Sequence, residues 1–276
     1  MQIALVDAFT ETKGQGNRAG VCLEGDAFTP AERQAAAAAI GASETAFVVQ
    51  GEADVTLRYH SPSTEVPFCG HATLATFHRL AEIGRLAPGT YRLGTREGVQ
   101  AVTVASDGAI WLTTPQYPLT ESPLTEPELL AMLRADAEVL DRSLPIRHAG
   151  PNLMIPLRSR HALHGLTPDF AAMRSFEPRG VIGVHGFTRD VAEVGSALHA
   201  RFFCPAHGID EDPVTGSASG LLAAYLVAQG GLSTPGETRF EQGDSMGKPG
   251  RVAVRVGADG QILVGGRAVT VLTGTL

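Results

Sequence analysis

Short runs in which apolar and polar residues alternate recur along the whole chain and predict β-strands. Alternation with a period of two gives a strand one buried face and one exposed face. The predicted strands cover residues 3–9, 46–50, 54–60, 109–114, 152–157, 181–187, 200–204, 251–256 and 268–272.

Two longer stretches, 70–84 and 216–230, predict helices of a particular kind. Their residues are small or apolar on nearly all sides, which is typical of a helix that other elements enclose. A further helix is predicted at 30–41, where Thr29 is a suitable N-cap and Pro30 the first helical residue. Weaker patterns predict helices at 126–135 and 189–197. Because strands greatly outnumber helices and do not alternate with them, the pattern favours an α+β fold over a Rossmann or TIM-barrel arrangement.

The same order of motifs occurs twice. RYHSP at 58–62 returns as RFFCP at 201–205, and FCGHAT after Pro67 returns as VTGSAS after Pro213. In each copy an aromatic strand leads through a polar loop to the start of one of the two apolar helices. A repeat in this order indicates two similar halves.

A proline-rich stretch at 115–127 is the natural linker between these halves. We expect the first half to comprise residues 1–117 together with a C-terminal strand at about 264–276. The second half is expected to comprise residues 118–263.

Composition limits the expected partners and location. The formal net charge is −7 and no cluster of Lys and Arg occurs, so neither nucleic acid nor an anionic membrane is expected as a partner. The longest apolar stretch, 218–228, is too short to span a bilayer, and residues 1–10 lack the features of a signal peptide. Cys22, Cys69 and Cys204 have no paired spacing, which favours reduced thiols and a cytoplasmic protein.

The starts of the two apolar helices are candidate binding sites. Gly70 and Gly216 let the backbone approach a ligand, and the first N–H groups of a helix bind anions such as a carboxylate. The alternative is that both glycines serve only close packing. The occurrence of two such starts, one in each half, favours a site for a small carboxylate.

Three residues near these starts are candidates for acid–base chemistry. His71 follows Gly70 in the first helical turn, where a neutral imidazole can shuttle a proton or donate a hydrogen bond. Glu44 precedes an apolar strand, and partial loss of solvent there would suit a general acid or base. Asp212 ends an acidic loop just ahead of the second helix. The alternative interpretation is that His71 serves only the structure and that Glu44 and Asp212 are solvated carboxylates in loops. No pattern such as His-Glu-x-x-His occurs, so no metal is expected.

Five motifs in order carry a resemblance that covers almost the whole chain. They are VDAFTETKGQGNRAGVCL, SETAFV, TEVPFCGHAT, DEDPVTGSASG and EQGDSMGKPGRV. Together they closely resemble the phenazine-biosynthesis PhzF-like family of the diaminopimelate epimerase superfamily. The resemblance implies that each half is a β-barrel-like sheet wrapped around one central helix, with pseudo-twofold symmetry and the site in the cleft between the halves. It also implies a homodimer and chemistry without cofactor or metal.

The resemblance also implies roles for individual residues. The family's general acid/base glutamate falls on Glu44, its helix-start histidine on His71 and its site aspartate on Asp212. Its substrate-binding positions fall on Gly70, Gly216 and Ser217.

Cys69 stands where related racemases and epimerases of the superfamily have one of two catalytic cysteines. The corresponding residue in the second half is Thr215. Its hydroxyl has a pKa far above that of a thiol and cannot replace a thiolate base. Racemisation by two thiols is therefore disfavoured.

Three functions follow as hypotheses. The favoured one is a cofactor-independent isomerase that moves a proton or double bond in a small unsaturated carboxylic acid, with Glu44 taking and returning the proton. A second is a hydrolase that cleaves a C–C bond on the same fold. A third is a non-catalytic binding protein, which the loss of acid/base positions would favour.

Overall fold

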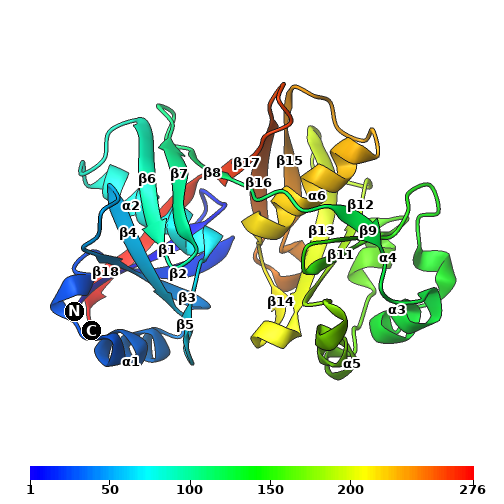
Figure 1. The fold of residues 1–276 in the computed structure, drawn as a ribbon, viewed down its shortest axis with the longest axis horizontal. Coiled ribbons are helices and arrows are strands. Elements are labelled where there is room, and N and C mark those ends of the chain that lie inside the picture. The colour runs from blue at the N-terminus through cyan, green and yellow to red at the C-terminus, as the bar shows by residue number, and fades with distance from the viewer. The chain divides into compact units, whose positions relative to one another are not determined.

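The protein is described by a computed structural model that covers all 276 residues. The chain divides into two compact units, Met1–Thr113 with Val264–Leu276, and Thr114–Leu263. Each unit consists of strands arranged about one long helix (Figure 1), so the predicted α+β fold class is confirmed. No helix is long and apolar enough to cross a membrane.

The first unit contains two helices. One of its strands, β18, comes from the C-terminal end of the chain and pairs antiparallel with β1. The strands are β1 (Gln2–Ala8), β2 (Asn17–Cys22), β3 (Glu44–Val49), β4 (Val55–His60), β5 (Glu65–Val66), β6 (Gly89–Thr95), β7 (Gly98–Val104), β8 (Ile110–Thr113) and β18 (Ala268–Thr275). The helices are α1 (Pro30–Ile40) and α2 (Gly70–Glu82), with a 3-10 turn, η1 (Gly25–Ala27).

The second unit contains four helices. Its strands are β9 (Leu119–Glu121), β10 (Arg147–Ala149), β11 (Asn152–Pro156), β12 (Gly183–Thr188), β13 (Ser196–Cys204), β14 (Ile209–Asp212), β15 (Gly236–Gln242) and β16 (Gly250–Val256), followed by β17 (Ile262–Gly266), along which the chain leaves this unit. The helices are α3 (Glu126–Leu133), α4 (Arg160–His164), α5 (Phe170–Ser175) and α6 (Gly216–Ala228), with 3-10 turns η2 (Ala137–Val139), η3 (Glu177–Arg179), η4 (Pro205–His207) and η5 (Asp244–Met246).

Strand pairing follows the same order in both units. In the first, β2 pairs parallel with β3 and β3 antiparallel with β4. Strand β4 pairs antiparallel with β5 and parallel with β6, which pairs antiparallel with β7. The same five pairings, in the same directions, join β11, β12, β13, β14, β15 and β16 of the second unit. The sequence repeat therefore corresponds to a repeated topology.

Both predicted enclosed helices are confirmed. Helix α6 is buried over nearly all of its length, and at Gly220 a Cβ atom would lie 2.3 Å from the side chain of Thr114. Only glycine allows the helix to pack this closely. Helix α2 is buried over its first two turns, while its last turn reaches the surface, where Arg79 and Glu82 form an ion pair of 2.6 Å.

The two enclosed helices also satisfy their buried hydroxyl groups in the same way. In α2, Thr73 donates a hydrogen bond of 2.7 Å to the carbonyl of Cys69. In α6, Ser219 donates one of 2.9 Å to the carbonyl of Thr215. A buried hydroxyl without such a partner would cost free energy. Small hydroxyl side chains are therefore tolerated inside both units.

The helices predicted at 30–41 and 126–135 are also confirmed. Helix α1 begins after Thr29, whose hydroxyl accepts the N–H of Glu32 while the Glu32 carboxylate accepts the N–H of Thr29. This reciprocal pair is a capping box. Helix α3 ends at Leu133 because the next residue, Arg134, has a left-handed backbone with φ of 49°.

The helix predicted at 189–197 is wrong. The segment is a loop that leads into β13. The buried carboxylate of Glu241 accepts the backbone N–H groups of Ala192 at 2.8 Å and Glu193 at 2.7 Å, and Gly195 has a φ of +91°. A distant carboxylate thus binds N–H groups that a helix would have used internally.

His185 on β12 is a histidine with no exposed surface. Its ring lies edge-on to Phe202 with 5.4 Å between ring centroids, and neither nitrogen has a hydrogen-bond partner. Burial lowers the pKa of His185 to about 3. The folded protein therefore keeps this ring neutral over most of the acidic range.

We expect His185→Leu to weaken the dependence of stability on pH. An unfolded chain protonates this ring at its ordinary pKa of 6.5. Between about pH 6.5 and 3 the unfolded state binds the extra proton, so stability falls as the pH falls. Urea unfolding at several pH values in that window should show a smaller loss of stability in the variant than in the wild type. An equal loss in both proteins would contradict the prediction.

Candidate active site

A carboxylate and an imidazole meet inside the first unit. Glu44 is the first residue of β3 and His71 is the second residue of α2. Glu44 Oε2 lies 3.4 Å from His71 Nε2, and the two residues are only 8% and 7% exposed. Because both groups can carry a proton and are shielded from water, the pair can hold a proton or pass it on.

Two further side chains contact His71 within the same unit. Ser43 Oγ lies 3.1 Å from Nε2, and Cys69 Sγ lies 3.4 Å from Nδ1. Ser43 also donates to Asn17 Oδ1 at 3.4 Å, at the start of β2. These contacts fix the imidazole on both edges, so its orientation is set by groups from two segments, the start of β3 and the start of α2.

The start of β2 is braced by an ion pair between the buried Asp7 and the partly exposed Arg18. Asp7 is 1% exposed and accepts from Arg18 Nε at 2.7 Å and from the backbone N–H of Gly14, also at 2.7 Å. The hydrogen bonding that Arg18 donates to the Asp7 carboxylate raises the pKa of the Arg18 guanidinium. The loop between β1 and β2 is thereby tied to the strand that carries Asn17.

The second unit holds a different polar set at the equivalent helix start. The Thr215 hydroxyl donates to Asp212 Oδ2 at 2.5 Å. Gln242 accepts the backbone N–H of Thr215 at 3.2 Å and donates to the carbonyl of Asp212 at 2.8 Å. Gly216 is buried and Ser217, one residue further, is exposed. The loop ahead of α6 is therefore held rigidly while the Ser217 side chain stays accessible.

The two helix starts correspond residue for residue. Cys69 is the N-cap of α2 and Thr215 is the N-cap of α6, and both have extended backbones. Gly70 and Gly216 follow as the first helical residues. Neither N-cap side chain accepts a backbone N–H of the first helical turn. The first N–H groups of each helix therefore have the arrangement that can bind an anion.

Strand ladders show which residue of the second unit corresponds to Glu44. Tyr59 pairs with Ala46, which lies two residues after Glu44. Phe202 is the counterpart of Tyr59 in the sequence repeat, and it pairs with His185, which lies two residues after Gly183. Gly183 is therefore the equivalent of Glu44. A Cβ atom at Gly183 would lie 2.5 Å from the Phe202 ring, which leaves no room for a side chain. Only one half can present an acid at this position.

The predicted site residues thus fall into two sets. The first unit brings together Glu44 and His71, with Gly70 beside them in sequence. The second brings together Asp212 and the residues of its helix start, Gly216 and Ser217. The expectation that both sets face one cleft stays a prediction.

Three functional contacts were missed from the sequence. The residues concerned lie inside or beside the family motifs given above, but their spacing in the sequence does not indicate a role; they are Asn17, Ser43 and Gln242. Each becomes recognisable only through its partner in a distant segment.

One group of side chains in the first unit has the chemistry of metal ligands. Single ligand atoms of Glu44, Cys69 and His71 all lie within 4.8 Å of one another. A thiolate, an imidazole and a carboxylate suit a transition metal rather than Mg²⁺ or Ca²⁺. The expectation of a reaction without metal stays a prediction.

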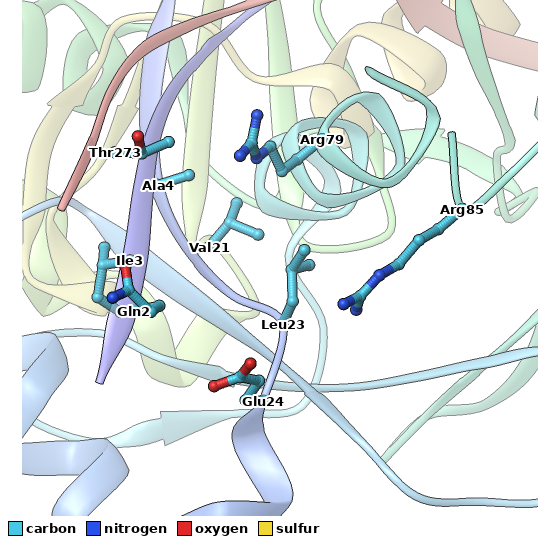
Figure 2. A pocket seen from close by; sticks show the side chains of 9 residues that line it. All are labelled: Gln2, Ile3, Ala4, Val21, Leu23, Glu24, Arg79, Arg85 and Thr273. Carbon is cyan, nitrogen blue, oxygen red and sulfur yellow. The ribbon is translucent and has the colours of Figure 1, made fainter. Parts of the chain in front are cut away.

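A cavity of about 110 Å³ lies elsewhere in the first unit, by the last turn of α2. Figure 2 shows Arg79 and Arg85 reaching toward it from α2 and the segment after it. Small-molecule sites usually measure about 300–1,000 Å³, so this cavity is small for a substrate site. Its lining contains none of the predicted site residues and consists of Gln2, Ile3, Ala4, Val21, Leu23, Glu24, Arg79, Arg85 and Thr273.

Comparison with known proteins gives consistent matches over the whole chain. Residues 6–274 match the family described as phenazine biosynthesis-like protein (PhzC-PhzF). The chain is 35% identical to an uncharacterised isomerase, YfhB, of Bacillus subtilis, over 99% of this chain and 95% of that protein. It is 33% identical to the uncharacterised isomerase YddE of Escherichia coli K12, over 92% and 90% of the two chains.

A solved structure supports the same grouping. The crystal structure of a Bacillus anthracis phenazine biosynthesis protein of the PhzF family is similar with a TM-score of 0.93 and 29% identity. The match covers 100% of this chain and 98% of that one. The match confirms the two-half, epimerase-like fold.

We expect Gln242→Ala to loosen the start of α6. The substitution leaves the backbone N–H of Thr215 and the carbonyl of Asp212 without these partners inside the protein. Losing hydrogen bonds to buried groups costs about 1–3 kcal/mol. Amide hydrogen exchange of Thr215 should accelerate at least about tenfold.

Gln116→Ala is the matched control. Gln116 is an exposed glutamine of the same unit that donates to the carbonyl of Gly260. Its removal should leave the exchange of Thr215 unchanged. Unchanged exchange in Gln242→Ala as well would show that Gln242 does not hold this loop.

Proposed function

The chain belongs to the phenazine biosynthesis-like protein family, and from this premise we propose that it is an isomerase that needs no cofactor. Its substrate is a small unsaturated carboxylic acid. The reaction moves a proton from one carbon to another and shifts the double bond accordingly. The isomerase names of the curated relatives support the reaction class.

The observation that carries this proposal is the buried contact between Glu44 and His71 at 3.4 Å. Glu44 takes a proton from carbon, the double bond moves, and the same carboxyl group returns the proton to a second carbon. No atom or electron is gained or lost in this sequence. A single proton-carrying group is therefore sufficient, and no redox cofactor is required by the balance.

The difference between the two halves favours one base over two. The equivalent of Glu44 is Gly183, where no side chain has room. The equivalent of Cys69 is Thr215, and its hydroxyl already donates to Asp212. A racemase of the two-thiol kind needs a base on each face of the carbon, and the second half supplies no thiol at that position.

The remaining residues bind and orient the substrate in this proposal. His71, held by Ser43 and Cys69, orients the substrate and stabilises charge that develops when Glu44 removes the proton. The first N–H groups of α2 and α6, at Gly70 and Gly216, donate hydrogen bonds to the carboxylate of the substrate. Asp212 and the exposed hydroxyl of Ser217 hold its other polar groups.

We expect Glu44→Gln to lower turnover by about 10² or more, because it preserves shape and removes the group that carries the proton. The assay incubates the enzyme in D₂O with a panel of small unsaturated carboxylic acids. Nuclear magnetic resonance detects the shifted double bond in each acid that is turned over, and mass spectrometry detects the deuterium that enters when the proton held on Glu44 exchanges with D₂O before its return. Binding of that acid should change little.

Glu52→Gln serves as the control for Glu44→Gln. Glu52 is exposed in the loop between β3 and β4, and its variant should exchange deuterium at the wild-type rate. If Glu44→Gln also exchanges at a near-normal rate, Glu44 is not the base and the proposed mechanism is wrong.

We expect Cys69→Ala to keep at least a tenth of the wild-type turnover. This corresponds to a rise in the barrier of no more than about 1.4 kcal/mol. The thiol contacts His71 but does not carry the proton in the proposed reaction. The same deuterium assay measures the effect, and circular dichroism checks the fold. A variant that is folded but inactive would require a thiol mechanism instead.

A further inference from the structure

The ligand-type atoms around His71 form a compact group that extends beyond the proposed proton pair. Cys69 Sγ lies 3.9 Å from His71 Nε2, and Glu44 Oε2 lies 3.4 Å from the same nitrogen. We propose that Glu44, Cys69 and His71 bind one Zn²⁺ ion, and that the bound ion inhibits the enzyme.

The spacing of these atoms is close to that of a zinc site. Zinc binds sulfur at about 2.3 Å, and imidazole nitrogen and carboxylate oxygen at about 2.0–2.2 Å. At tetrahedral angles these bonds place the ligand atoms about 3.3–3.6 Å from one another. Glu44 Oε2 is already at such a separation from His71 Nε2, 3.4 Å. Cys69 Sγ lies 3.9 Å from Nε2 and 3.4 Å from Nδ1, so the Cys69 side chain must rotate toward Nε2 to share an ion with it. A water molecule completes the coordination.

Charge and burial favour occupancy by zinc. The Cys69 thiolate and the Glu44 carboxylate together carry two negative charges, which balance the two positive charges of the ion. The His71 imidazole binds as a neutral ligand. A neutral cluster is compatible with three largely buried residues. The thiolate selects zinc over magnesium and calcium, which prefer oxygen ligands.

This site has no recognisable ligand spacing in the sequence, because its ligands come from two separate elements. Cys69 and His71 are two residues apart at the start of α2, and Glu44 arrives from β3. The bound ion would occupy the carboxylate that acts as the base. Inhibition thus rests on the proposed function, whereas binding of the ion does not.

Metal binding is measured first, without any substrate. The wild-type chain is titrated with CoCl₂, because Co²⁺ bound to a thiolate gives an intense charge-transfer absorption in the near ultraviolet. Zinc affinity is measured by competition with a chromophoric chelator. We expect one equivalent of metal, and at least about a tenfold loss of zinc affinity in Cys69→Ala and in Glu44→Gln.

Cys22→Ala is the matched control. Cys22 is a fully buried cysteine of the same unit, and burial raises its pKa so that it stays a thiol. Its variant should keep the charge-transfer band and the wild-type affinity. Absence of stoichiometric binding, or equal binding in folded Cys69→Ala, would overturn the proposal. Circular dichroism establishes folding, and Cys69→Ser replaces the alanine variant if that one fails to fold.

The two proposals fail separately. If deuterium exchange is found in the wild type, zinc should abolish it and a chelator should restore it. If zinc binds as predicted but no acid is turned over, the isomerase proposal fails while the metal site stands. If exchange is found and zinc leaves it unchanged despite stoichiometric binding, the inhibitory role is wrong.

Discussion

Each unit of the protein surrounds one helix with strands, so the side chains of that helix must be apolar or hydrogen-bonded on every side. Helices α2 and α6 meet this requirement with small residues and with hydroxyl groups that return to the N-cap carbonyl. Tyr59 adds a further contact, because its hydroxyl lies 2.6 Å from that of Thr73. The start of each helix is thereby fixed to the strands around it.

A rigid helix start has a chemical consequence. The first N–H groups of a helix attract anions only where they are held in place and not consumed by a side-chain cap. Neither N-cap side chain hydrogen-bonds these N–H groups, because the Cys69 thiol contacts the His71 ring and the Thr215 hydroxyl donates to Asp212. The same constraint that encloses the helices therefore leaves both starts without a side-chain cap, and the carboxylate site expected there stays a prediction.

The repeated topology supports different chemistry in its two copies. Glu44 stands at the start of β3, whereas the equivalent Gly183 is pressed against Phe202. Once an aromatic ring fills that space, the second unit cannot carry a second acid there. Its polar contribution is instead the loop from Asp212 to Thr215, which Gln242 holds through the backbone. The homodimer and the cytoplasmic location implied by the sequence stay predictions.

The sequence by itself determined the features that depend on local pattern. The alternation of apolar residues identified nine strands. The small or apolar residues on nearly all sides of α2 and α6 indicated that they are enclosed, because a helix of this kind is typical of a buried position. The repeat of motifs identified two similar halves, since each motif returns at a nearly constant distance along the chain. Glu44, His71 and Asp212 were selected as candidate site residues through their motifs, and their roles stay predictions.

Tertiary structure decided what depends on partners far apart in the chain. The segment at 189–197 is a loop because Glu241, which is distant in sequence, binds its N–H groups. The contact of Glu44 with His71 and the role of Gln242 arise in the same way. A hydrogen bond or ion pair across many residues leaves no periodicity in the sequence, because its geometry is set by how strands and helices pack and not by the spacing of the residues that form it.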